Sequence, residues 1–370
     1  MTNHVITEKQ TQSIFIMFGL GSLAASGISP QAKQDTWISV LLAGIMMLPL
    51  IALYVRIITL YPGLNLFEII FKIFGKFFGK IISLIFIIFA IHLGSMIIKV
   101  CTTFIRILNM PQTPELLTVA FILLVAIWSV TCGPENVGRL AKFSWFILAS
   151  SIFITFIIGL KDMNFSNLKP IMETNFKTLL GSAFNFCMLP FGEMILCFCF
   201  FSSVSAKASP SKLILRSHVS IIVIFLAVML RNILVLGVTT ALLVDYPSYA
   251  CVSILSIGDF FTRMEVLIGI NLFLAGFIKV SVCLYTSSLG IAKVLHIQDQ
   301  KSVVVPCALL MGTLSTMLYS NSMDLSNWLK IFQFYAIPYE IILPLIIWIG
   351  AEIQTRMNAA STKAVKDTSS

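Results

Sequence analysis

The chain has 370 residues, of which 58% are hydrophobic and only 11% are charged. A soluble domain is about half apolar and about a quarter charged, so this composition excludes a soluble protein and indicates one that crosses a membrane several times. The formal net charge of +9 comes from basic residues scattered through short loops. Since they form no basic face with interleaved aromatic residues, we expect no binding to nucleic acid.

The apolar segments predict ten membrane-spanning helices, because a span needs about 20 apolar residues. With an even number of spans both termini lie on one side of the membrane, and the basic residues between spans favour that side by about two to one. This bias predicts cytoplasmic termini, with a polar segment at 1–10 and a disordered polar tail at 354–370. The predicted spans are 11–29, 36–60, 81–108, 115–131, 142–160, 176–202, 214–243, 264–293, 302–319 and 336–353.

The first predicted span contains an interruption made of Gly19, Leu20, Gly21 and Ser22. Glycine lacks the side chain that penalises irregular dihedral angles, so this stretch can leave the helix at low cost. In lipid an unwound backbone survives only where protein buries it or where it lines a cavity. The freed amide groups would suit an anionic group such as a carboxylate, although small residues here also fit close packing between helices.

The sixth predicted span is interrupted more strongly, because Pro190, Phe191, Gly192 and Glu193 follow Leu189. Proline removes a backbone donor and clashes with the preceding helical turn. A carboxylate at bilayer depth is costly, so it should face a partner or a water-filled cavity. We therefore expect Glu193 to bind a ligand ammonium, to accept a proton or to pair with a buried lysine. A proline kink beside a structural acid is the alternative.

The two interruptions occupy equivalent places if the ten spans of a single domain at 11–353 divide into halves at about 11–160 and 176–353. Five spans in each half mean that the second half enters the membrane from the opposite side. This is the pattern of an inverted repeat, in which substrate binds near the bilayer midplane between the broken helices.

Several ionisable residues lie inside other predicted spans. His92, Lys99 and Arg106 are seven residues apart on the third span and share one helix face, which fits a lining for an aqueous path. A core hydrogen bond for His92 and snorkelling of Arg106 are the alternatives. Arg231 on the seventh span and Lys279 on the eighth are each candidates to neutralise the acid of the sixth span, as coupling or gating residues.

No motif for catalysis or metal binding is found. The eight cysteines lie mostly inside apolar runs, where cysteine behaves as a small hydrophobic residue, and no set of cysteine and histidine has the spacing of metal ligands. A phosphate-binding loop, a nucleophile elbow and the zinc-protease motif are missing from the sequence. We therefore expect neither an enzyme nor a cofactor or metal.

Five segments together resemble the spore germination permease family, the B subunits of GerA-type nutrient germinant receptors in the amino acid–polyamine–organocation superfamily. The segments are Gly19–Ser22, Lys33–Trp37, Leu189–Met194, Arg263–Val266 and Gly276–Ser281. The resemblance covers almost the whole chain and implies an all-helical membrane fold of the LeuT type with broken first and sixth helices. It also implies a germinant site between spans one, three, six and eight. Ile98 on span three and Tyr285 on span eight join the two interruptions as candidate binding residues.

The resemblance further implies a multi-pass protein of the spore inner membrane that works with an A subunit and a lipoprotein C subunit. Its germinant would be an amino acid, a nucleoside, a sugar or an ion, and the small apolar surroundings of the first interruption favour a small amino acid. Two other functions remain open at this point. One is a secondary transporter, with proton coupling through Glu193 and Lys279 as an option. The other is an ion-conducting path lined by His92, Lys99 and Glu193.

Overall fold

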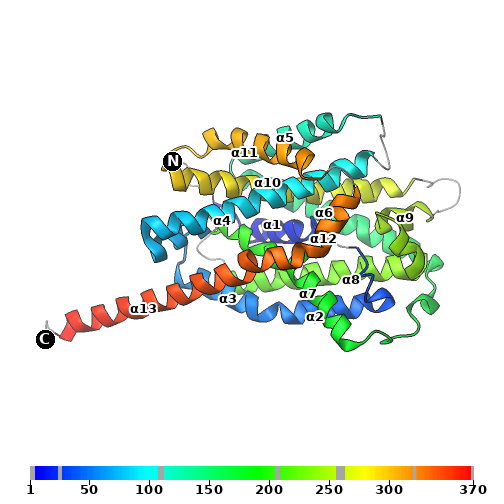
Figure 1. Ribbon diagram of the computed structural model, residues 1–370, viewed down its shortest axis with the longest axis horizontal. Coiled ribbons are helices and arrows are strands. Elements are labelled where there is room, and N and C mark those ends of the chain that lie inside the picture. Colours follow the sequence, from blue (N-terminus) through cyan, green and yellow to red (C-terminus); the bar gives the residue numbers. More distant parts are fainter. Residues whose placement is uncertain are drawn as a thin grey trace.

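The computed structural model describes residues 5–23, 27–106, 112–204, 209–255, 263–319 and 322–367. The regular structure in these ranges is helical, and the β-pairing consists of one isolated bridge between Ile6 and Val204. The helices form a bundle in which most axes run roughly along the long dimension of the molecule (Figure 1).

Thirteen α-helices and several short 3₁₀ and π segments make up the described chain. They are α1 (Glu8–Leu20), η1 (Lys33–Asp35), α2 (Thr36–Met46), α3 (Leu48–Leu60), α4 (Leu66–Phe104), α5 (Glu115–Thr131), α6 (Pro134–Gly159), η3 (Leu160–Asp162), η4 (Phe165–Leu168), α7 (Phe176–Phe186), η5 (Cys187–Phe191), η6 (Gly192–Ser203), α8 (Pro210–Leu243), α9 (Pro247–Ser253), α10 (Glu265–Leu295), α11 (Lys301–Met317), α12 (Ser322–Ile337), η7 (Pro338–Ile342) and α13 (Leu343–Asp367).

Seven helical stretches of the described chain are long and apolar enough to cross a membrane, and α5 and α11 are shorter apolar helices. Each of these nine overlaps one of the predicted spans, so the protein is a multi-pass membrane protein. The predicted span at 11–29 corresponds to α1, which has only 13 residues, and positions 24–26 of that span lie outside the described residues. A total of ten spans therefore stays a prediction. The seven stretches are Lys33–Leu60, Leu66–Phe104, Pro134–Asp162, Phe176–Ser203, Pro210–Leu243, Glu265–Leu295 and Met323–Asn358.

Three segment ends differ from the prediction. Helix α4 begins at Leu66 rather than near residue 81, and the last stretch begins at Met323 rather than at 336. Polar residues in the first turns of both stretches lower their hydropathy and conceal them from a search for apolar runs. The expected disordered tail at 354–370 was wrong as far as Asp367, because α13 continues to that residue. The sequence from Ala351 to Asp367 contains no glycine or proline that would end the helix.

The beginnings of two helices are fixed by local sequence. Thr7 precedes α1 and exchanges hydrogen bonds with Gln10, and Asn65 precedes α4 and exchanges hydrogen bonds with Glu68. Each pair satisfies backbone amide groups that a helix start leaves unpaired. These capping boxes set where the first and third spans begin.

Two long helices change direction at a glycine. Gly75 in α4 has φ 70° and Gly237 in α8 has φ 72°, a backbone conformation that side-chain-bearing residues rarely adopt. Both residues interrupt a helix that is otherwise continuous. Each of the two helices therefore consists of two segments that meet at a kink.

Helix α10 occupies a central place in the bundle. It packs along α4 and also contacts α1, α5, α6 and α11. Helix α1 is enclosed by α6, α8 and α10, and its residues from Ser13 to Leu20 are buried. By contrast, large apolar side chains such as Phe77, Phe146 and Leu243 are exposed on the outside, as expected of a surface that faces lipid. Because α1 and α10 lie in the interior, both contribute buried residues to the candidate site.

Candidate functional site

The sixth span is broken at the predicted place. Helix α7 ends at Phe186, a π-helical turn covers Cys187–Phe191, and a 3₁₀ helix continues from Gly192 to Ser203. Within the turn, Leu189 has the non-helical angles φ −126° and ψ 106°. Such π turns are rare and occur frequently at functional sites. This segment delivers Glu193 to the interior, where the exposed fraction of its side chain is 0%.

The first span also ends at the predicted interruption. Helix α1 stops at Leu20, Gly21 caps it, and Ser22 follows in a turn. A Cβ atom on Gly21 would lie 2.8 Å from the side chain of Lys279 and 3.0 Å from the carbonyl oxygen of Ala275. Only glycine therefore permits this close approach between the end of α1 and α10.

The two interruptions are joined by one buried ammonium group. The Nζ atom of Lys279 donates to Ser22 Oγ and forms an ion pair with Glu193 Oε2. Ser22 Oγ in turn donates to Glu193 Oε2 over 3.0 Å, and the ammonium lies 4.7 Å from the centre of the Phe18 ring. All three polar side chains are buried. Desolvation largely offsets the attraction inside such a pair, so it orients the two breaks more than it stabilises the fold.

A second buried acid, Glu340, belongs to the same site and was missed in the sequence. It lies in the π-helical turn Pro338–Ile342, and its exposed fraction is 0%. Both of its carboxylate oxygens lack a hydrogen-bond partner among the described residues, as does Glu193 Oε1. The carboxylate occupies the space beside Gly192, and Tyr54 Oη donates to the carbonyl oxygens of Glu340 (2.7 Å) and Gly192 (3.2 Å). The signal was available, since Glu340 follows a proline in an apolar run as Glu193 does.

Two cavities adjoin this region. The larger, of about 850 Å³, opens between the ends of α7, α8 and α12 and reaches down to Leu189 in the broken sixth span. The smaller, of about 80 Å³, lies beyond the end of α1 and is lined mainly by α6, α8, α9 and α10. Four residues line both cavities and so form a common wall: Gly27, Ile28, Tyr246 and Pro247.

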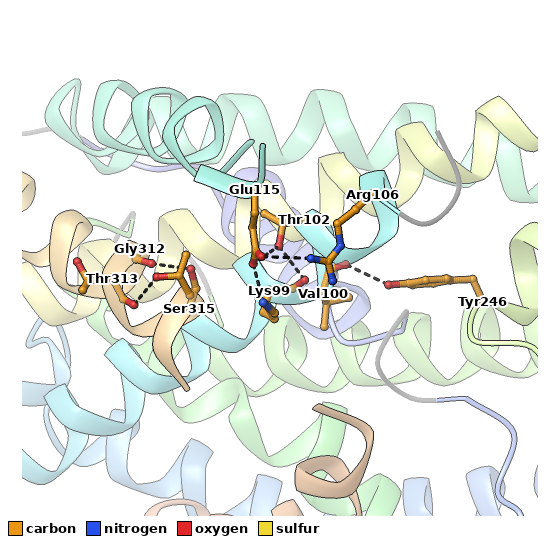
Figure 2. Close-up of polar contacts among 10 residues, drawn as sticks. Lys99, Val100, Thr102, Arg106, Glu115, Tyr246, Gly312, Thr313 and Ser315 are labelled. Carbon is orange, nitrogen blue, oxygen red and sulfur yellow. Dashed lines mark hydrogen bonds and ion pairs between the residues drawn. The ribbon is translucent and has the colours of Figure 1, made fainter. Parts of the chain in front are cut away.

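Tyr246 is held in this common wall by its neighbours. Its hydroxyl donates to the carbonyl oxygen of Val100 over 3.2 Å, as Figure 2 shows, and its ring meets that of Phe104 edge-on at 5.0 Å. Burial raises the pKa of the phenol above its usual value. The hydroxyl therefore stays a neutral donor at physiological pH, and the side chain is fixed between the two cavities.

Some of the predicted binding residues line one of the two cavities, and the others lie elsewhere in the protein. Leu20 and Gly21 line the small cavity. Tyr285 lies toward the other end of α10, where its ring stacks on Phe200 at 4.5 Å. The predicted residues that line neither of the two cavities are Gly19, Ser22, Ile98, Pro190, Phe191, Gly192, Glu193 and Tyr285.

The residues predicted to line an aqueous path on the third span have separate partners. His92 Nε2 lies 3.0 Å from Tyr319 Oη, and its ring packs against Trp328 and Tyr335. Lys99, with an exposed fraction of 1%, donates to Glu115 Oε1 at the start of α5 over 2.6 Å. Figure 2 shows that Arg106 also reaches Glu115, at 3.7 Å.

Arg231 does not reach Glu193. Its Nη1 atom donates to Thr155 Oγ1 over 2.8 Å and its Nη2 atom to Asn232 Oδ1 over 2.9 Å, within the wall of the small cavity. Of the two basic residues considered as partners for Glu193, the structure pairs Lys279 with it.

Solved structures with the same arrangement of helices are secondary transporters. A Na+-coupled sialic acid symporter in a substrate-bound outward-open state superposes with a TM-score of 0.64 at 13% identity, over 95% of this chain and 89% of the other. Mhp1, a nucleobase-cation-symport-1 family transporter in a closed conformation with bromovinylhydantoin bound, gives 0.66 at 11% identity, over 92% and 78%. These similarities show that the chain has the fold of LeuT-type transporters.

The family follows from the sequence. The family model described as "Spore germination protein" matches residues 5–350, so the chain belongs to the spore germination permease family. It is 26% identical to spore germination protein KB of Bacillus subtilis strain 168, over 94% of each chain. It is 24% identical to the putative spore germination protein YfkT of the same strain, over 86% of this chain and 87% of the relative. The resemblance seen in the five sequence segments is thereby confirmed. The chain is thus a multi-pass membrane protein of this family with the fold of LeuT-type transporters, and the relatives it matches are spore germination proteins.

Proposed function

We propose that this protein is the membrane subunit of a nutrient germinant receptor, which binds a small germinant inside the bilayer and thereby triggers spore germination. The observation that carries the proposal is the pair of adjoining cavities at the end of α1, with Tyr246 in their common wall. The large cavity provides a route from the surface, and the small one provides a site beside a broken helix. Irregular backbone at this depth is typical of ligand sites in this fold.

In this proposal the protein lies in the spore inner membrane with both termini in the cytoplasm. It assembles with an A subunit and a lipoprotein C subunit, as the family resemblance implies. The bound germinant favours one of two conformations of the helices around the cavities, and the assembly passes this change on. A ligand can act in this way only by binding the signalling conformation better than the resting one.

The test is germination of spores that lack this gene, nutrient by nutrient, beside the parent strain. Loss of the response to one defined nutrient, restored by the wild-type gene, is expected. Complementation with Ile152→Phe, which fills the small cavity, should fail, whereas Ile154→Phe on the same helix should succeed. Ile152 lines the cavity and Ile154 is 44% exposed on the outside of the bundle. An unchanged response of the deletion strain to every nutrient would contradict the proposal.

A secondary transporter is the second candidate, and the buried cluster of Glu193, Lys279 and Glu340 favours it. Two acids and one base inside a membrane form a group that a coupling proton or cation can neutralise. Uptake of labelled nutrient into vesicles containing the purified protein separates the two candidates. Accumulation above that of empty vesicles supports transport, and binding without accumulation supports the receptor.

A further inference from the structure

The wall of the small cavity carries one cation without an anionic partner. The exposed fraction of Arg231 is 1%, and the oxygen atoms that accept from it, Thr155 Oγ1 and Asn232 Oδ1, are neutral. Within the described part of the chain, no carboxylate forms an ion pair with its guanidinium, and Arg231 is the charged residue of the cavity lining. A buried charge without a counter-ion is strongly unfavourable. The cavity therefore suits an anionic ligand.

The geometry of the guanidinium favours a carboxylate among anions. Arginine has five N–H groups in a flat fork that matches the two oxygens of a carboxylate, and it stays charged at any physiological pH. Three donors, on Nε, Nη1 and Nη2, are used by Asn232 and Thr155. The side chain of Cys251 is a further, uncharged partner of the guanidinium, so at least one N–H group remains for a ligand. Because the used donors also fix the plane of the group, little side-chain entropy is lost on binding.

A second polar atom in the same wall is complementary to an ammonium group. Asn271 lies on α10 with an exposed fraction of 8% and lines the cavity. Its Nδ2 atom donates to Ser151 Oγ over 2.8 Å, which directs the amide so that Oδ1 is the free acceptor. This Oδ1 atom is buried and has no partner among the described residues. It is placed to accept a hydrogen bond from a ligand N–H group.

The rest of the cavity restricts the size and character of the ligand. Most of the lining is apolar and includes Leu20, Ile152, Val228 and Ile268. A cavity of about 150 Å³ holds a benzene molecule, so one of about 80 Å³ admits a smaller ligand. A short aliphatic side chain fits these walls.

We propose that the small cavity is a site for a glycine- or alanine-sized amino acid, whose carboxylate pairs with Arg231 and whose ammonium donates to Asn271 Oδ1. The proposal rests on the proposed function and adds the ligand class and the two side chains that recognise it. Arg231 thus acts in ligand recognition, and charge coupling to Glu193 is left to Lys279.

The first experiment varies the ligand and leaves the protein intact. Purified wild-type protein is heated in detergent with L-alanine, with L-alaninamide, with acetate or with sodium chloride. Alanine is expected to raise the unfolding temperature, and alaninamide, which lacks the carboxylate, is expected to leave it unchanged. Equal stabilisation by alanine and alaninamide would overturn the proposal, and so would equal stabilisation by chloride, which would mean a general anion site.

The second experiment uses spores that carry the complete receptor with a variant of this subunit. Arg231→Gln is expected to raise the alanine concentration for half-maximal germination by about 10- to 100-fold, as expected for loss of a charged hydrogen bond. Arg231→Lys should retain part of the response. Asn271→Leu should raise the required alanine concentration, and alaninamide should still fail to replace alanine in this variant. Arg216→Gln is the matched control, since Arg216 lies on the same helix and is exposed.

The outcomes separate this inference from the proposed function. If deletion of the gene removes a nutrient response but Arg231→Gln restores it fully, the receptor role stands and the site assignment fails. If Arg231→Gln protein is missing from the membrane, Asn271→Leu and the ligand series with wild-type protein decide the question.

Discussion

The carboxylate of Glu340 occupies the space that a Cβ atom on Gly192 would need. The two residues come from the last membrane stretch and the broken sixth span, and each lies in or directly after a π-helical turn. The contact brings a second acid to the buried pair of Glu193 and Lys279. The site is therefore a meeting point of three spans and the end of α1.

Gly192→Ala is expected to damage the protein through this contact. The new Cβ would collide with Glu340 Oε2 and lie 3.2 Å from the carbonyl oxygen of Cys187, which cannot move away. Overpacking of this kind costs about 1–3 kcal/mol. Thermal unfolding in detergent measures the effect. Gly181→Ala is the control, since a Cβ at Gly181 in the same span meets no atom within 4 Å. Equal stability of the two variants would contradict the role of this contact.

Glu193→Gln is expected to be strongly destabilising. It leaves the ammonium of Lys279 buried without its anionic partner, and breaking a buried pair from one side costs about 3–5 kcal/mol. The double variant Glu193→Gln with Lys279→Met should recover much of the loss. Glu352→Gln breaks a pair in which Arg56 is 51% exposed, so it should change the stability little, because solvent screens such a pair. Unfolding curves of the four proteins make the comparison.

Glu340→Gln, by contrast, is expected to leave stability unchanged or to raise it. Neither oxygen of Glu340 has a hydrogen-bond partner in the described chain, so the substitution strands no other group. An unpaired carboxylate needs a proton or another cation to neutralise it at this depth, and an amide does not. The result to look for is an unfolding temperature at or above wild type. A loss as large as that of Glu193→Gln would show that a cation bridges the two acids.

Glu115→Gln is expected to weaken the packing between the end of α4 and the start of α5. Lys99 is buried, and Glu115 accepts from it over 2.6 Å (Figure 2), so the variant leaves a buried ammonium poorly paired, at about 1–3 kcal/mol. Hydrogen exchange of the first turn of α5 reports the loosening. Arg139→Gln tests an exposed pair on α6 in the same assay, where Arg139 is 69% exposed, and there we expect no change.

Tyr246→Ala is expected to join the two cavities, because this ring forms part of their common wall. Nutrients larger than the small cavity should then compete with the natural germinant. Tyr246→Phe removes only the hydroxyl that donates to the carbonyl oxygen of Val100 and should keep the wild-type selectivity. Germination of spores with a series of amino acids of increasing size shows the difference. Unchanged selectivity in Tyr246→Ala would argue against the wall.

Much of the fold could be predicted because each membrane span requires a long apolar run, which is easy to recognise in a sequence. Long apolar runs predicted most spans. The clusters of glycine and proline predicted both interruptions, at Leu20 and at Leu189. The stretches near Leu66 and Met323 were harder, since their polar residues break the apolar run. In these places packing against neighbouring helices decides the structure.

The site was predictable only in part, for a different reason. Glu193 and Lys279 are recognisable in the sequence as charged residues inside apolar segments, and their pairing was one of the predicted alternatives. The partner of each charge depends on helix rotation, which a single sequence does not specify. For this reason the pairing of Lys99 with Glu115 was not predicted. Glu340 carried the same signal as Glu193 and was overlooked because the last span was placed without regard to its acid.

The position of Lys279 has a mechanical consequence. Its side chain holds Ser22 after the first helix and Glu193 in the sixth span at once, and both bonds end on one nitrogen. A shift of α10 by one helical turn, about 5.4 Å along its axis, would have to release both partners together. A displacement that begins at either interruption thus reaches the other through this ammonium group or through the direct hydrogen bond from Ser22 to Glu193, without a longer chain of contacts.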